Sequence, residues 1–180
     1  MKKNSHLISV FFLFLISTGM INKTQPPILE CQDLHGKKVV LPQDVIGKKS
    51  IIVLAATKKA EEDLQSWMKP FFDTFITDNS TNIFATESYD VNTFFIPVFS
   101  GVAKAAASNI QKKMLNGLDP LLQSHVLIYR GSANKLFDEL DLDKKEVAII
   151  ILDSDGSILK KFKGGYDENK MEEIEKTLQD

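Results

Sequence analysis

Two uninterrupted apolar runs constrain the fold of this chain more than any other feature. Residues Ile51–Ala56 and Val147–Leu152 contain no polar side chain. A strand that is apolar on both faces belongs inside a sheet that is covered on both sides, usually by helices. The two runs therefore predict an α/β domain with both strands buried in its sheet.

The segments around these runs predict the remaining elements from hydrophobic period and turn residues. In chain order we expect a hairpin over 28–40, a strand over 51–56, a helix over 60–76, a strand over 91–97, a helix over 101–115, a strand over 125–130, a short helix after Ser132, a strand over 147–152, a return strand over 157–163 and a final helix capped by Asp167. Pro70 should kink the first helix, because proline lacks the backbone N–H. This order predicts a three-layer sandwich with a central mixed sheet, an N-terminal hairpin and an inserted helix.

The inserted helix is expected to bury one stripe and to expose the rest. Its apolar stripe would contain Val102, Ala106, Ile110 and Met114 at helical spacing. The same pattern places Gln111, Lys112 and Lys113 on the solvent side. Gly117 would close the helix.

The N-terminus has the pattern of an export signal. Lys2 and Lys3 precede the apolar run 7–16, and the small residues Ser17 and Gly19 follow it. The run is shorter than the roughly 20 residues that span a bilayer, so residues 1–19 are interpreted as a cleaved signal peptide. A retained membrane anchor is the alternative. We expect residues 20–27 to be a linker, residues 28–180 to be one domain, and the protein to be periplasmic or secreted from a bacterium, with no stable membrane span once the signal is removed.

Size and charge exclude one class of partner. Loss of residues 1–19 leaves 161 residues with 20 basic and 24 acidic side chains. That length suffices for one domain with its own core. A mildly acidic chain without a clustered basic stripe argues against nucleic acid as a partner.

Cysteine usage is the next constraint, since export would permit disulfides. The chain has one cysteine, Cys31, which cannot form an internal bridge. It lies in an alternating segment, so we interpret it as a small, half-buried side chain on an N-terminal strand. A lone reactive thiol is the alternative.

Three stretches resemble the thioredoxin-like superfamily, in the layout of exported thiol–disulfide oxidoreductases and of thiol peroxidases of the peroxiredoxin type. They are Leu34–Leu41 with Gly47 and Lys48 downstream, the strand 51–56 followed by Thr57, and the hairpin Val147–Gly165 with its Asp-x-x-Gly turn. The resemblance covers nearly the whole exported chain. It implies a redox site between the strand 51–56 and the helix that follows.

The chain differs from that family at the positions of the catalytic residues. The cysteine pair is replaced by Lys59 and Glu62, and the position of the family's cis-proline falls on Val147. A cis bond before a non-proline residue costs roughly 2.5–4 kcal/mol, so we expect a trans bond there. Disulfide exchange therefore does not transfer to this chain. The insertion 97–123 also resembles that of thioredoxin-like mitochondrial ATP synthase assembly factors, which lack the cysteine pair as well.

No other constellation predicts a catalytic or metal site. The copper-delivery branch of the superfamily uses a cysteine pair and a histidine, whereas the exported chain retains only His35, His125 and Cys31 without ligand spacing. Ser124 beside His125 lacks a nucleophile-elbow pattern. We therefore expect no metal and no cofactor.

Two functions remain open from the sequence. The first is a non-catalytic envelope protein that acts through contacts with an unidentified envelope protein, as a chaperone, assembly factor or adaptor. Its docking surface would be the helix 101–117, with an alanine-rich face at Ala103, Ala105, Ala106 and Ala107. The second is a thiol-dependent oxidoreductase or peroxidase that uses Cys31, which requires an exposed thiol with a lowered pKa.

Overall fold

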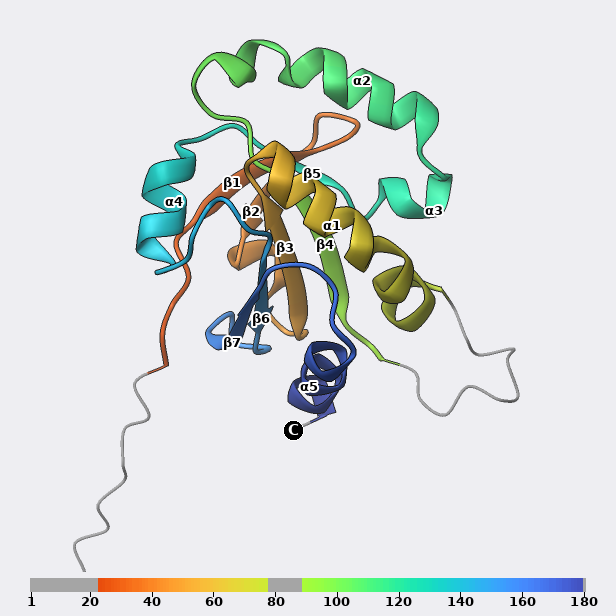
Figure 1. Cartoon of the computed structure of the whole chain (residues 1–180), viewed down its shortest axis with the longest axis vertical. Helices are drawn as coiled ribbons and strands as arrows, with labels where there is room; N and C mark the ends of the chain where they lie inside the picture. Colours follow the sequence, from red (N-terminus) through yellow and green to blue (C-terminus); the bar gives the residue numbers. More distant parts are fainter. Residues whose placement is uncertain (1–22, 78–88, 180) are drawn as a thin grey trace, which may run out of the picture.

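The computed structural model describes residues 23–77 and 89–179. Its strands are β1 (Leu29–Asp33), β2 (Lys38–Leu41), β3 (Ser50–Ala55), β4 (Asn92–Pro97), β5 (Leu127–Tyr129), β6 (Ala148–Leu152) and β7 (Ile158–Lys163). Its α-helices are α1 (Lys58–Phe71), α2 (Ala107–Gly117), α3 (Pro120–Gln123), α4 (Ala133–Glu139) and α5 (Glu168–Gln179). Figure 1 shows strands between helices, with α2 and α5 at opposite ends of the molecule.

The strands form two hydrogen-bonded sheets. One has the order β4-β3-β6-β7, in which only the β3–β4 pair is parallel, and the other is the antiparallel order β2-β1-β5. Single parallel bridges, Phe95 to Val126 and Val98 to Tyr129, join β4 to the short strand β5. The predicted α/β class with a mixed sheet is confirmed, and the predicted N-terminal hairpin is β1–β2.

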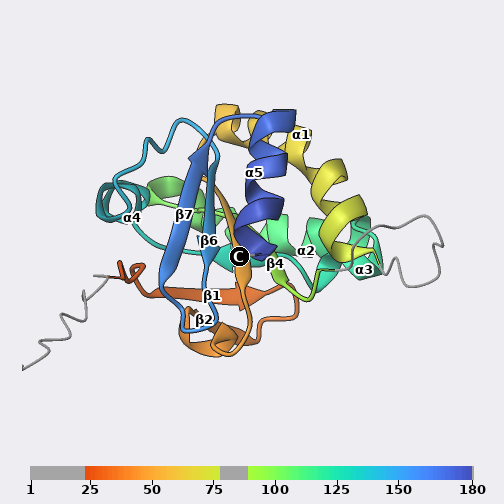
Figure 2. The same cartoon turned by 90° about the horizontal axis from the view of Figure 1, so that it is seen from below.

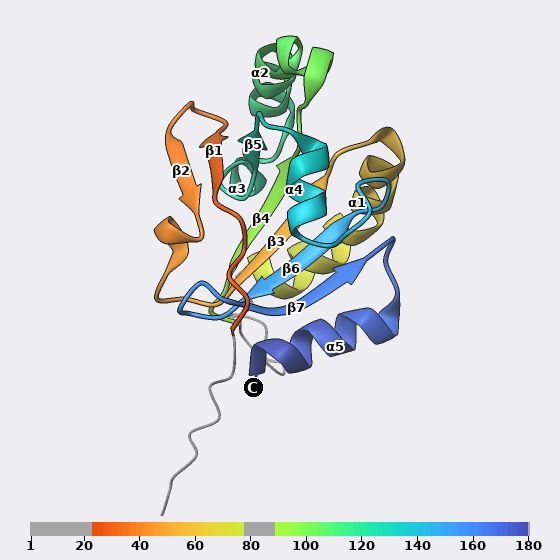
Figure 3. The same cartoon turned by 90° about the vertical axis from the view of Figure 1, so that its left-hand side faces the viewer.

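Alternate residues of the central strands supply two cores, one on each face of the sheet. Ile51 and Val53 of β3 pack in a cluster with Trp67 and Phe71 of α1 and Ile174 of α5. The other face is covered by α4, as Figures 2 and 3 show. There the cluster contains Ile52, Leu54, Ile150, Leu136 and Phe137. Every residue of β3 and β6 is buried, as their apolar sequences predict.

Pro70 ends the regular geometry of the first helix. The prediction of one kinked helix over 60–76 is wrong in detail, because α1 ends at Phe71 and a π-helical turn follows over Phe72–Ile76. Proline cannot donate the backbone hydrogen bond that the α register requires. The following turn uses longer i→i+5 bonds, such as Thr77 N–H to the Phe72 carbonyl at 2.9 Å.

The insertion also departs from the predicted helix. Gly101–Ala105 is a 3₁₀ turn, and α2 begins only at Ala107. Three residues per turn instead of 3.6 remove Val102 from the predicted stripe, and its side chain is 96% exposed. Ile110 and Met114 do pack against the core. Ala107 is buried, so the predicted exposed alanine face loses that member.

The segment predicted as a linker contacts the domain where it is described. Lys23 Nζ lies 2.9 Å from Asp153 Oδ2 and 2.6 Å from Asp155 Oδ2, and Thr24 accepts a 2.8 Å bond from Ile158 N–H. The Lys23 ammonium holds the pKa of both carboxyls below their usual range. The predicted signal peptide lies outside the described residues. Within the described residues, no helix has the length and apolar character needed to cross a membrane.

A buried hydroxyl gives a first stability prediction. Thr93 Oγ1 on β4 is fully buried and has no hydrogen-bond partner among the described residues. Thr93→Val replaces it with a methyl group of similar shape, which should raise the free energy of unfolding by about 1 kcal/mol in urea titration. Thr93→Ser keeps the hydroxyl and removes the methyl group, so it should destabilise. A destabilising valine would contradict the unsatisfied hydroxyl.

The turn between β6 and β7 gives a second stability prediction. Gly156 has φ +83°, and a Cβ there would meet Pro42 Cβ at 3.1 Å. Gly36 in the β1–β2 turn has φ +90° with open space around it. Gly36→Ala should therefore cost only the left-handed strain, about 1–2 kcal/mol. Gly156→Ala should cost about 1 kcal/mol more, because the contact is added. Equal losses in thermal unfolding would contradict the crowding at Gly156.

Candidate functional site

The junction between β3 and α1 is the position at which the resemblance implies a redox site. Ala55 ends β3 in the core, and Thr57 caps α1 by accepting a 3.2 Å bond from Ala60 N–H through Oγ1. A threonine in extended geometry is an effective N-cap. The first turn of α1 is thus closed by its own cap, with no sulfur atom in residues 55–64.

Lys59 and Glu62 lie on the exposed side of this turn. They are three residues apart on one helix, but no ion pair joins them among the contacts within 23–77 and 89–179. The structure therefore places both residues at the junction as exposed side chains. Two exposed side chains of opposite charge at this spacing contribute only tenths of a kcal/mol.

Val147 directly precedes β6, whose first residue, Ala148, pairs with Leu54 near the end of β3. It is fully buried, and its carbonyl accepts a 3.0 Å bond from Gly164 N–H. The Gly164 carbonyl in turn accepts a 2.9 Å bond from Trp67 Nε1. Among the described residues the one cis peptide bond precedes Pro42 and not Val147. Val147, which was predicted to match the family's cis-proline, is thus part of the core.

Cys31 lies far from the junction in the sheet order, on β1, with β5 and β4 between it and β3. Its side chain is 1% exposed and packs in the core cluster on the α4 side. Burial raises the pKa of the Cys31 thiol to about 12. An apolar site disfavours the thiolate, which is the nucleophilic form.

The two described histidines lie in different environments. His35 is exposed in the β1–β2 turn, whereas His125 Nδ1 lies 2.8 Å from the Thr93 carbonyl. Within residues 23–77 and 89–179, no three His, Cys, Asp or Glu side chains are grouped so that they could hold a metal ion. Ser124 Oγ donates to the Leu121 carbonyl at 2.9 Å, so its hydroxyl is used locally.

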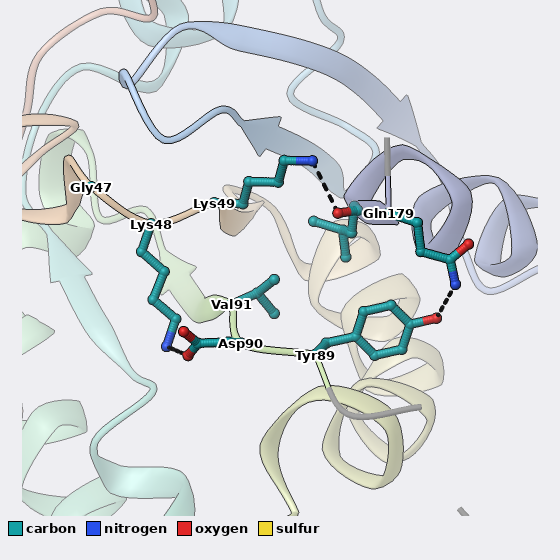
Figure 4. Close-up of a pocket in the computed structure, with 8 residues that line it drawn as sticks. Gly47, Lys48, Lys49, Tyr89, Asp90, Val91 and Gln179 are labelled. Carbon is teal, nitrogen blue, oxygen red and sulfur yellow. Dashed lines mark hydrogen bonds and ion pairs between the residues drawn. The ribbon is translucent and has the colours of Figure 1, made fainter. Parts of the chain in front are cut away.

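A surface hollow of about 480 Å³ lies where β3 begins and α5 ends (Figure 4). Its polar groups bind one another: Lys48 pairs with Asp90, and Lys49 Nζ donates to the Leu178 carbonyl at 3.0 Å. Gln179 Nε2 donates to the Tyr89 hydroxyl at 3.2 Å. A cation on the last carbonyls of a helix stabilises its C-terminus. These contacts therefore join α5 to the start of β3 and to the segment before β4.

One polar network was missed by the sequence analysis. Gln111 on α2 was predicted to face solvent, but its Nε2 donates to the carbonyls of Asp33 and Leu34 at 2.9 and 3.2 Å. Arg130 Nη2 donates to Gln111 Oε1 at 2.6 Å, and Arg130 Nη1 also binds Gln32 Oε1. These residues are distant in sequence, so helical period alone could not reveal them. The network attaches the insertion to the N-terminal sheet.

Comparison with solved structures identifies the fold. No protein-family model matches the chain, and no curated protein matches it. BsSco, of the Sco family of cytochrome c oxidase assembly proteins, matches 88% of this chain and 95% of its own with 14% identity and a TM-score of 0.54.

Two further solved structures match the chain over a similar length. The exposed lipoprotein thioredoxin Etrx1 of Streptococcus pneumoniae matches 85% of this chain and 98% of its own with 20% identity and a TM-score of 0.52. A DsbE-type thiol:disulfide interchange protein of Chlorobium tepidum matches 87% and 94% with 11% identity and a TM-score of 0.53. Identities this low support the fold alone. The chain has the thioredoxin-like fold, and its one cysteine, Cys31, cannot form a Cys-x-x-Cys pair.

Proposed function

We propose that this protein is a non-catalytic thioredoxin-like module that acts through contacts with another protein of the bacterial envelope. The observation that carries the proposal is the β3–α1 junction, where Thr57 caps the helix, Lys59 and Glu62 are exposed, and residues 55–64 contain no sulfur atom. A scaffold can keep its fold while its site changes function. The similarity to BsSco, from a family of assembly proteins, supports an assembly role among the possible contact roles.

The burial of Cys31 argues against the alternative enzyme. A thiol peroxidase or oxidoreductase needs an accessible thiol with a lowered pKa. Cys31 has the opposite properties, since it is 1% exposed with a pKa raised to about 12.

Export to the envelope is part of the proposal. The basic and apolar pattern of residues 1–19 supports it, and so does the similarity to Etrx1, which is an exposed lipoprotein. Peptide mass spectrometry of the protein purified from the envelope should find an N-terminus at Met20. An intact N-terminus would favour the anchor instead.

A redox assay tests the non-catalytic role. We expect the exported chain and its Cys31→Ser variant to give the same background rate of disulfide reduction and of peroxide consumption. Activity of the unaltered chain that disappears in Cys31→Ser would overturn the proposal, because it would identify a relocated catalytic thiol.

Site-specific photocrosslinking tests the contact. A photoreactive residue at Asn116, exposed on α2, should give one discrete crosslinked product in the source cells. The same residue at Asn169, exposed on α5, is the matched control and should not. Equal products from both positions would contradict docking through the insertion.

A further inference from the structure

Charge is segregated along the chain and along the molecule. The chain has a net charge of −2, yet residues 91–118 contain three lysines, Lys104, Lys112 and Lys113, and no Asp or Glu. This segment includes α2, which stands at the opposite end of the molecule from α5 in Figures 1 and 3. Helix α5 has more acidic than basic side chains, namely Glu168, Glu172, Glu173 and Glu175 against Lys170 and Lys176. The insertion is therefore a basic segment of an acidic chain, with Asp33 and Asp119 as the carboxylates beside it.

The three lysines are not neutralised within the described part of the chain. Ion pairs there engage other lysines, namely Lys23, Lys38, Lys48, Lys69, Lys135, Lys160 and Lys163. Lys104, Lys112 and Lys113 are exposed and take part in none of these pairs. On α2, Asn109 and Asn116 lie between the two lysines on the outward side by helical period. We call Val102, Lys104, Asn109, Lys112, Lys113 and Asn116 the basic insertion face.

The basic insertion face is held in place before any partner binds. Ile110 and Met114 pack α2 against the core, and Gln111 ties it to β1 through two backbone carbonyls. Arg130 holds the Gln111 side chain from β5. Binding to a face that is already ordered avoids part of the entropy cost of association.

We propose that the basic insertion face binds an acidic segment of the partner protein. This inference rests on the proposed function and adds the chemistry of its partner. Complementary charge would guide the encounter and exclude basic partners. The 3₁₀ turn adds the exposed Val102 and small alanines, which let a partner backbone approach closely.

An anionic membrane fits the face less well than an acidic protein segment. Peripheral helices that bind membranes bury bulky apolar side chains such as Trp, Phe or Leu in the headgroup layer. On the basic insertion face the only large apolar side chain is Val102. Lysines alone would leave such binding weak.

The test uses the exported chain and three defined probes. They are a labelled peptide of repeating Glu and Ala, the same peptide with Lys in place of Glu, and vesicles of phosphatidylglycerol with phosphatidylcholine. Fluorescence anisotropy should show binding of the Glu peptide that weakens as salt is raised. Lys112→Glu/Lys113→Glu should weaken that binding about tenfold, since two attractions become repulsions.

The matched control reverses two lysines elsewhere. Lys145 and Lys176 are also exposed and have no ion pair among the described contacts, so Lys145→Glu/Lys176→Glu makes the same change in net charge. It should leave the affinity for the Glu peptide nearly unchanged. Equal losses in both variants, or tighter binding to the vesicles than to the Glu peptide, would overturn the inference. Either result would leave the proposed contact role to be decided by the crosslinks at Asn116.

Discussion

Trp67→Ala is expected to lower the free energy of unfolding by about 3–5 kcal/mol, a large part of the stability of a domain of this size. Trp67 is fully buried on α1, with its ring 4.9 Å from Phe71 and 5.2 Å from Tyr166 between centroids. Its Nε1 also donates to the Gly164 carbonyl at 2.9 Å. The truncation would leave a cavity between α1 and the segment that joins β7 to α5.

Trp67→Phe separates packing from the hydrogen bond. Phenylalanine keeps a ring in the core but leaves the Gly164 carbonyl without its donor, which should cost about 1–3 kcal/mol. Urea unfolding followed by circular dichroism measures both variants, because the chain has no second tryptophan to report by fluorescence. If the two variants lose the same free energy, ring packing is not the main contribution and the prediction fails.

Buried strands and capped helices were the predictable part of the fold. The apolar runs identified β3 and β6 because no other site in a domain accepts residues that are apolar on both faces. Ser132 and Asp167 cap α4 and α5 as predicted, through bonds to the N–H groups of Lys135 and Lys170 at 3.3 and 3.1 Å. Apolar runs and helix caps involve residues that are close together in the sequence, so a single sequence suffices to predict them.

The insertion was harder to predict because its geometry depends on distant residues. Helical period treats residues 101–117 as one helix, but the chain enters through a 3₁₀ turn at Gly101, whose φ is +55°. Gln111 looks like a solvated residue until β1 and β5 are placed beside it. The candidate docking face therefore follows from tertiary contacts and not from period alone.

At the β3–α1 junction, the sequence alone could show only that the cysteines of the family are absent. Residues 56–62 show that thiols are missing, which is a fact of the sequence. The fold was needed to show that α1 begins with a threonine cap and exposed Lys59 and Glu62, and that Val147 lies in the core. The burial of Cys31 followed from strand alternation, but the depth of that burial did not, because it depends on α4 covering the sheet.

Cys31 is expected to react with a disulfide reagent about a thousandfold more slowly in the folded protein than in the urea-unfolded chain at pH 8. Burial raises the thiol pKa from 9.0 to about 12, so the folded state holds far less thiolate at that pH. The measurement is the rate of thiol release with and without urea. Comparable rates would show that Cys31 is accessible and would revive the thiol-dependent alternative.

The same shift predicts a loss of stability in alkali, and the sign follows from proton binding. Between pH 9 and about 12 the unfolded thiol has released its proton whereas folded Cys31 keeps it, so the unfolded state is favoured as pH rises. The slope should approach about 1.4 kcal/mol per pH unit. Tyr129, opposite Cys31 on β5, also has a pKa raised by burial and adds to the slope. Cys31→Ala removes the thiol contribution and the part of the Tyr129 shift that Cys31 causes, so its unfolding free energy should fall less steeply over this range. Parallel curves for the two proteins would mean that Cys31 ionises in the folded state, and the buried interpretation would then be wrong.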